Sequence, residues 1–344
     1  MRGISGADEG SARRLPRVAL GMGDPAGIGP EIVVKALSDP ALHEACVPVV
    51  IGDAGVLSRA PGWRDGEPRI VPIAEAEEAR PEPGVAYLLD LANVPASLKP
   101  GEPSAEGGRA SVEYLTRGVE LAMAGRVEAV VSAPFNKEAM KKGGFHYLDE
   151  YEYLSDLCRV DQYTVLMVSP RFTLASVTLH VPMREMAQLI TRDRVLMTLR
   201  YSDRAVKAAG IARPRIGVAA LNPHAGEGGT LGTEERDAIR PAVEAARAEG
   251  IDAYGPFAAD SFFMTVKDPV YDVYVGMYHD QGRIALKLLE FGRATTMAEG
   301  LPVLFCTVGH GTAYDIVGRG VARHENMRDT LMLAARRAVT RRRE

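Results

Sequence analysis

Short apolar runs alternate along the chain with longer segments whose apolar residues recur at helical spacing. The short runs are typical of buried strands, and we expect strands over residues 18–22, 47–51, 127–131, 164–168, 172–179, 216–221 and 273–277. The longer segments are typical of amphipathic helices, and we expect helices over residues 31–37, 105–124, 183–209 and 234–249. This alternation predicts an α/β fold with a largely parallel sheet.

Composition narrows the class of protein. The chain has 344 residues, enough for two domains. Its 41 Lys and Arg against 45 Asp and Glu give a net charge of −4, which argues against nucleic acid as a partner. No apolar run approaches the roughly 20 residues of a membrane helix, so we expect no membrane contact. Three cysteines without a C-x-x-C pair argue against a disulfide framework and favour a reducing cytoplasm.

A glycine-rich turn follows the first predicted strand. Residues 21–26 match G-x-G-x-x-A, the pattern of a Rossmann dinucleotide site. Pro25 lacks the N–H that such a loop donates to phosphate, and Asp53 lies 30 residues after Gly23, too far for the usual ribose contact. We therefore interpret the segment as a close strand-to-helix turn that can line an active-site cleft.

Histidines follow several of the predicted strands. His180, His224 and His279 each come after a different strand, and His310 lies in a further glycine-rich loop. Ligands of an open α/β sheet gather at the carboxyl ends of its strands, so three imidazoles could share one divalent cation there. Asp280 could orient an imidazole or act as a base. A single histidine is equally compatible with a hydrogen-bonded structural role, and the residues alone leave both interpretations open.

Seven segments together resemble the 4-hydroxythreonine-4-phosphate dehydrogenase (PdxA) family. They occur in the family's order between about residue 17 and residue 325, and they read GDPAGIGPEI (23–32), SAPFNKEAM (132–140), TLHVPM (178–183), LNPHAGEGGTLGTEE (221–235), GPFAAD (255–260), MYHDQGRIALK (277–287) and VGHGTAYDIVGRGVA (308–322). The resemblance implies an isocitrate/isopropylmalate dehydrogenase-like, two-domain α/β/α fold with the active site in the interdomain cleft. It also implies a homodimer whose active site is shared across the subunit interface.

The order of elements along the chain suggests a domain division, with boundaries near Pro134 and Gly300. We expect a disordered extension over the polar, glycine-rich residues 1–15 and a first α/β domain built from residues 16–135 and 300–344. The second α/β domain is expected over residues 136–299, where it would carry the metal site and the dimer interface.

Metal-binding and catalytic residues carry over by position. The family's three metal ligands fall on His180, His224 and His279, of which the resemblance assigns His279 to the neighbouring subunit. The expected metal is one divalent ion, zinc first, with cobalt, magnesium, manganese or iron as alternatives. The expected catalytic residues are Asp260, Asp280 and Lys137, with the choice of general base and the role of the lysine left open.

Cofactor residues are expected in two loops. The segment HGTAYDIVGRG resembles the loop that embraces the adenosine half of NAD in this fold, so its candidates are His310, Gly311, Thr312 and Asp315. Gly228, in the segment GEGG, is a further candidate for contact with the dinucleotide. The sequence does not distinguish NAD from NADP.

Substrate positions depart from the family's pattern. Lys287 matches the family's substrate-binding lysine, but Glu150 stands where the family has histidine. Thr296 replaces an asparagine and Phe305 an arginine. A carboxylate beside a phosphate is repulsive, and Phe305 with Tyr151 would suit a flat, partly apolar substrate.

These departures direct the expected function away from phosphate. Val-Gly-His-Gly at residues 308–311 resembles the branch of the family that oxidises terephthalate cis-dihydrodiol. We therefore expect metal-dependent, NAD(P)-linked oxidative decarboxylation of a non-phosphorylated diol acid such as that compound. The alternative is a dehydrogenase of 4-phosphohydroxy-L-threonine, 4-phospho-threonate or 4-phospho-erythronate. A non-catalytic binding protein is a third hypothesis, against which the three histidines, both aspartates and the HGTAYD loop argue.

Overall fold

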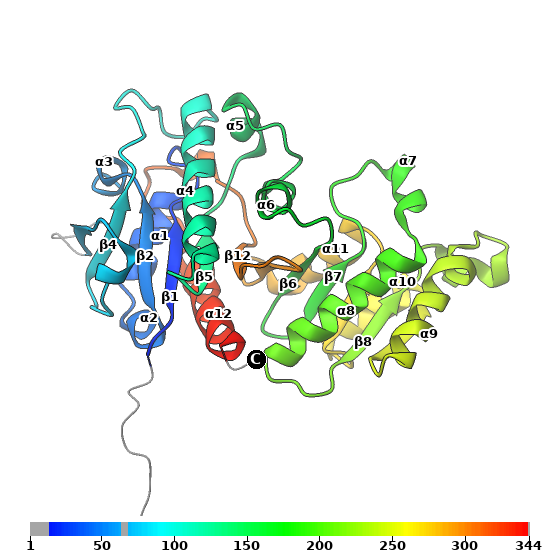
Figure 1. Cartoon of the computed structure of the whole chain (residues 1–344). Coiled ribbons are helices and arrows are strands. Elements are labelled where there is room, and N and C mark those ends of the chain that lie inside the picture. Colours follow the sequence, from blue (N-terminus) through cyan, green and yellow to red (C-terminus); the bar gives the residue numbers. More distant parts are fainter. Residues whose placement is uncertain (1–13, 63–67, 343–344) are drawn as a thin grey trace, which may run out of the picture.

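The computed structural model describes residues 14–62 and 68–342, which form a twelve-stranded sheet with helices on both faces (Figure 1). The strand order is β3-β4-β2-β1-β5-β12-β11-β6-β7-β10-β8-β9. The strands are β1 (Arg17–Gly21), β2 (Val47–Gly52), β3 (Arg69–Pro72), β4 (Val85–Asp90), β5 (Ala129–Ser132), β6 (Thr164–Val168), β7 (Thr173–Ser176), β8 (Arg215–Ala219), β9 (Asp252–Phe257), β10 (Val273–Gly276), β11 (Thr295–Glu299) and β12 (Phe305–Val308).

Helices pack against both faces of this sheet. The α-helices are α1 (Gly29–Leu37), α2 (Pro40–Ala45), α3 (Ala54–Leu57), α4 (Ala105–Met123), α5 (Lys137–Lys142), α6 (Glu150–Cys158), α7 (Met183–Met186), α8 (Arg192–Ala208), α9 (Arg240–Ala248), α10 (Ala259–Phe262), α11 (His279–Glu290) and α12 (Glu325–Arg341). In the view of Figure 1, α4 covers the front of one half of the sheet and α8 the front of the other, while α12 packs on β12 and β5. Among the residues described, no helix is long and apolar enough to span a membrane.

The predicted parallel sheet is confirmed, with one antiparallel insertion at its centre. β11 runs antiparallel to both β12 and β6, and β6 runs antiparallel to β7. The other described pairs are parallel. The strands up to β5, together with β12, form one half of the sheet, and β6 to β11 form the other. Because the sheet runs continuously through both halves, the domain division at residues 135/136 and 299/300 stays a prediction. The expected extension over 1–15 lies almost wholly outside the described residues.

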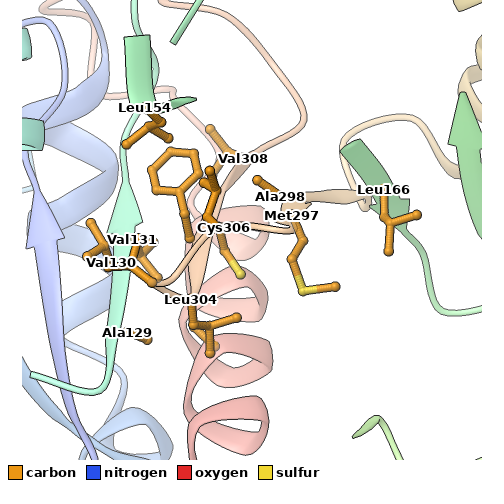
Figure 2. Packing of buried hydrophobic residues seen from close by; sticks show 14 of the residues in the cluster. Ala129, Val130, Val131, Leu154, Leu166, Met297, Ala298, Leu304, Cys306 and Val308 are labelled. Atoms are coloured by element: carbon orange, nitrogen blue, oxygen red, sulfur yellow. The ribbon is translucent and has the colours of Figure 1, made fainter. Parts of the chain in front are cut away.

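A buried apolar cluster joins the two halves at the centre of the sheet. Figure 2 shows Val131 of β5 and Cys306 of β12 close together, with Leu154 of α6 above them and Met297 of β11 beside them. All four side chains are almost completely buried. This packing fixes α6 over the central strands, and the residue that caps α6 belongs to the site described below.

Some elements differ from the sequence prediction. The expected helix over 183–209 is divided into α7, a 3-10 turn (Ala187–Leu189) and α8. The division occurs because Thr191 is the N-cap of α8, where its side chain accepts a hydrogen bond from the Arg194 N–H. The strands β3, β4, β9, β11 and β12 were not predicted, and neither was α11, whose first turn was interpreted as a loop. The helix matters most, because it begins at His279.

Candidate active site

Two of the three predicted metal ligands lie side by side in one chain. His180 follows β7 and His279 follows β10, and these strands are parallel neighbours. Just before the two histidines, the N–H and Oγ1 of Thr178 both donate to the carbonyl of Met277, at 3.1 and 2.8 Å. Because the two strands end side by side, the imidazoles lie close together, with ring centroids 5.5 Å apart.

Each of the three predicted histidines faces a carboxylate through Nδ1. A proton on Nδ1 that is donated to a carboxylate leaves Nε2 with a free lone pair, and metal-binding imidazoles are commonly oriented in this way. The pairs are His180 with Asp149, His279 with Asp280 at 2.6 Å, and His224 with Glu227 at 3.2 Å. This donor set therefore fits a divalent cation held by Nε2 atoms.

Asp149 serves both helix α6 and His180. As the N-cap of α6, its Oδ1 accepts from the N–H groups of Tyr151 and Glu152, each at 3.0 Å. Its Oδ2 accepts from His180. Burial raises the pKa of Asp149, but the hydrogen bonds from His180 and Glu152 outweigh that effect and hold the pKa below its usual value. Asp149 was not among the predicted site residues, although the D-x-x-E pattern at 149–152 is a helix-start signal that could have pointed to it.

Lys137 contacts the opposite nitrogen of the same imidazole. It is the first residue of α5, and its Nζ lies 3.2 Å from His180 Nε2. The position predicted to be catalytic therefore lies at the face of His180 that a cation would occupy. Burial lowers the pKa of His279, which favours the neutral imidazole that metal binding requires.

His224 is not part of this pair. It lies in the segment Pro223–Gly229, where five successive residues adopt left-handed backbone angles, and its side chain is 72% exposed. No cluster of three metal-ligating side chains occurs among the residues that the structure describes. Within one chain His279 lies beside His180, whereas His224 lies apart, so the expectation that His279 reaches the site from a neighbouring subunit stays a prediction.

The remaining predicted residues near His224 are on the surface. α10, which carries Asp260, packs against the segment Pro223–Gly229. Asp260 is exposed, and Gly228 has a φ of 66° with open space around it. The predicted residues thus fall into two groups within one chain, one around His180 and one around His224.

The predicted substrate residues are mostly enclosed. Tyr151, Thr296 and Phe305 are 4%, 5% and 0% exposed. The rings of Tyr151 and Phe305 meet edge to face, with their centroids 6.0 Å apart. Tyr151 and Phe305 thus pack against each other, and the expected role of all three residues as direct substrate contacts stays a prediction. Glu150 is half-buried, with its pKa raised by burial, and Lys287 is exposed on α11.

The predicted cofactor loop contacts the turn after β1. The Ile28 N–H donates to the Thr312 carbonyl at 3.0 Å, and the Tyr314 hydroxyl donates to Asp24 Oδ2 at 2.6 Å. A cavity of about 350 Å³ lies alongside, lined by residues that include Pro25, Gly27, Val317 and Gly318. Thr312 is buried, His310 is half-buried, and Gly311 and Asp315 are exposed.

Solved structures share this fold. A β-decarboxylating dehydrogenase from Thermococcus kodakarensis has the same fold, with a TM-score of 0.50 at 16% identity over 93% of this chain and 82% of that one. The family model for the pyridoxal phosphate biosynthetic protein PdxA matches residues 44–334. The chain belongs to the PdxA family.

Individual relatives give the same result. A 4-hydroxythreonine-4-phosphate dehydrogenase from Trichlorobacter lovleyi is 42% identical over 331 residues, covering 95% of this chain and 98% of the relative. The solved structure of the Klebsiella pneumoniae enzyme of that name has a TM-score of 0.83 and 36% identity over 95% and 99% of the two chains. A Clostridium botulinum protein provisionally named D-threonate 4-phosphate dehydrogenase is 37% identical over 93% of this chain and 96% of that protein. The chain is therefore a dehydrogenase that acts on a small molecule.

These findings overturn the expected substrate. A terephthalate 1,2-cis-dihydrodiol dehydrogenase from Burkholderia xenovorans covers 94% of this chain and 98% of its own, but with a TM-score of 0.63 and 31% identity. The stronger matches bear the names of phosphorylated substrates. The expectation of terephthalate cis-dihydrodiol as substrate was wrong, because relatives of higher identity are named for 4-hydroxythreonine 4-phosphate instead.

Proposed function

We propose that this chain oxidises a phosphorylated four-carbon hydroxy acid with NAD⁺, and that 4-hydroxythreonine 4-phosphate is the first candidate substrate. D-threonate 4-phosphate is the second, favoured by the 37% identity to the relative that bears its name. The observation that carries the proposal is the pair of imidazoles at neighbouring strand ends, each held at Nδ1 by a carboxylate.

The chain's residues divide the chemical work. His180 and His279 would hold one divalent cation through Nε2, with zinc first because its preferred ligands include imidazole. When bound, such a cation lowers the pKa of a substrate hydroxyl and polarises the carbonyl that oxidation produces. The carboxylates of Asp260 and Asp280 are the candidates for accepting the hydroxyl proton, while the hydride passes to NAD⁺. Lys137, at 3.2 Å from His180 Nε2, is placed to contact the same substrate atoms.

The turn after β1 and the predicted cofactor loop are the proposed binding place of the dinucleotide. The segment 310–315 and the turn at 24–28 are joined by two hydrogen bonds beside a cavity of about 350 Å³. We propose that this cavity takes the adenosine half of NAD, with Gly27, Val317 and Gly318 in its wall and Thr312 and Asp315 in the adjoining segment. Loss of CO₂ from the oxidised acid is part of the proposal, since a β-keto acid forms when the oxidised carbon lies next to the one that carries the carboxylate.

A second subunit would complete the site. α11 exposes an apolar stripe at helical spacing, in which Ile284, Leu288 and Phe291 are 60%, 80% and 81% exposed. Large exposed apolar side chains on one helix face are typical of a subunit interface. We propose that two copies pack through this stripe, and that His224 of the partner subunit supplies the third metal ligand.

We also propose a cytoplasmic location. The cysteines of the described residues are free thiols, which agrees with a reducing compartment.

Steady-state formation of NADH tests the proposed activity. Zinc-loaded protein with NAD⁺ should oxidise 4-hydroxythreonine 4-phosphate or D-threonate 4-phosphate with a kcat of roughly 1–10³ s⁻¹. The unphosphorylated acids should react far less efficiently, and removal of the metal by a chelator should stop the reaction until metal is returned. No turnover of either phosphorylated acid by metal-loaded protein would contradict the proposal.

A further inference from the structure

Arg283 is a cation without a partner in the candidate site. Its Nε is shielded from solvent and meets no hydrogen-bond acceptor in the described part of the chain. Neither do its terminal nitrogens form a hydrogen bond or an ion pair within 4.0 Å there. Burial lowers the pKa of Arg283, and the charged groups facing it are Glu150 and Asp149 from the start of α6 and Asp280 from its own helix, with the Tyr151 hydroxyl close by.

Arg283 is half-buried, and partial burial of an unpaired guanidinium is unfavourable, so such a group usually has an anion to bind. Other partly or fully buried cations of this protein do have partners. Arg337 donates to Glu299, and Lys35 donates to Glu31, both at 2.6 Å. Arg283 is thus unlike these residues, although three carboxylates lie in its surroundings. The planar set of N–H donors on a guanidinium without a partner matches the geometry of a phosphate group.

The helix places Arg283 at a suitable distance from the metal ligands. His279, Arg283 and Lys287 occur at intervals of four residues on α11 and so lie along one side of the helix. Each interval advances about 6 Å along the helix axis. A four-carbon acid whose hydroxyl lies at the His279 end would direct its phosphate toward Arg283.

We propose that Arg283 is the residue that binds the substrate phosphate in this protein. The inference rests on the proposed function, because it names the group that recognises the phosphate of that substrate class. It also accounts for the substitutions at the usual substrate positions. Glu150 and Phe305 stand where the family has a histidine and an arginine, and Arg283 supplies the positive charge that those replacements remove.

Two measurements on the metal-loaded protein test this assignment. Calorimetric titration with inorganic phosphate gives the affinity for the anion alone, and NADH formation gives KM and kcat for the phosphorylated acid. Arg283→Met should weaken phosphate binding by about tenfold or more and raise KM by a similar factor with a smaller effect on kcat. Arg283→Lys should have a phosphate affinity and a KM between those of Arg283→Met and the unmodified protein, because lysine keeps the positive charge but lacks the paired N–H donors of a guanidinium.

Arg293→Met is the matched control. Arg293 lies just beyond the end of α11 and pairs with Glu290 at 3.7 Å, so its removal should leave both measurements unchanged. Equal phosphate affinity of Arg283→Met and the unmodified protein, or no phosphate binding by the unmodified protein, would overturn the assignment. Phosphate binding that depends on Arg283 in a protein without dehydrogenase activity would support the assignment while the proposed function fails.

Discussion

Two inactive variants, His180→Ala and His224→Ala, should together regain activity when they are combined in one dimer. If His180 and His279 act from one chain and His224 from the other, each single variant leaves no complete site in a homodimer. A mixed dimer contains one site with all three histidines and one site that lacks two. Purified mixed dimers should therefore show about half of the activity of the unmodified dimer.

The pairing of His180→Ala with His279→Ala is the control. Because those two histidines lie in the same chain with ring centroids 5.5 Å apart, every site of that mixed dimer lacks one ligand and activity should stay absent. The opposite pattern, with recovery only in this second pair, would assign His279 to the neighbouring subunit after all. Absence of recovery in both kinds of dimer would place the site within one chain.

Asp149→Asn should weaken metal binding by about 10- to 100-fold. The amide oxygen can still accept from the N–H groups of Tyr151 and Glu152, so the cap of α6 is kept. The amide nitrogen cannot accept from His180 Nδ1, so the imidazole loses the carboxylate that orients it. Competition with a chelating dye measures the metal affinity without reference to turnover.

Asp39→Asn provides a matched variant for this experiment. Asp39 caps α2 through Oδ1, which accepts from the Ala41 N–H at 3.0 Å, in a part of the fold away from the histidines. It should show an unchanged metal affinity. A metal affinity for Asp149→Asn within about twofold of the unmodified protein, in a variant with the same thermal unfolding midpoint, would show that Asp149 only caps the helix.

Much of the architecture could be predicted because its signals are local. Apolar runs identified β1, β2, β6 and β10, and the strand ends correctly identified where His180 and His279 lie. The antiparallel insertion of β11 could not be predicted, because Thr295–Glu299 pairs with β12 and β6 through contacts that are distant in sequence. α11 was missed because its outer face is apolar, and Ile284 and Leu288 disturb the usual polar stripe of a surface helix.

The site was harder to predict, because its geometry also depends on contacts between residues that are distant in sequence. The sequence places His224 after β8, the strand next to β10 in the sheet. It does not show that the loop carrying His224 lies apart from His180 and His279. The Glu235 carboxylate accepts from the N–H groups of Leu221 and Asn222, at 2.8 and 2.7 Å. These hydrogen bonds hold the backbone at the start of the loop that carries His224. Likewise, Tyr151, Thr296 and Phe305 suggest a new ligand from sequence, whereas in the structure all three are buried and the rings of Tyr151 and Phe305 pack edge to face.

The proposed function depends on a metal held by histidines from two chains, and anomalous X-ray scattering from crystals of zinc-loaded protein tests this most directly. The expected result is one zinc ion per chain, bound by Nε2 of His180 and His279 and by Nε2 of His224 of the partner subunit, with a coordination position open to substrate. Zinc bound by residues of one chain alone, or bound away from His180 and His279, would contradict it.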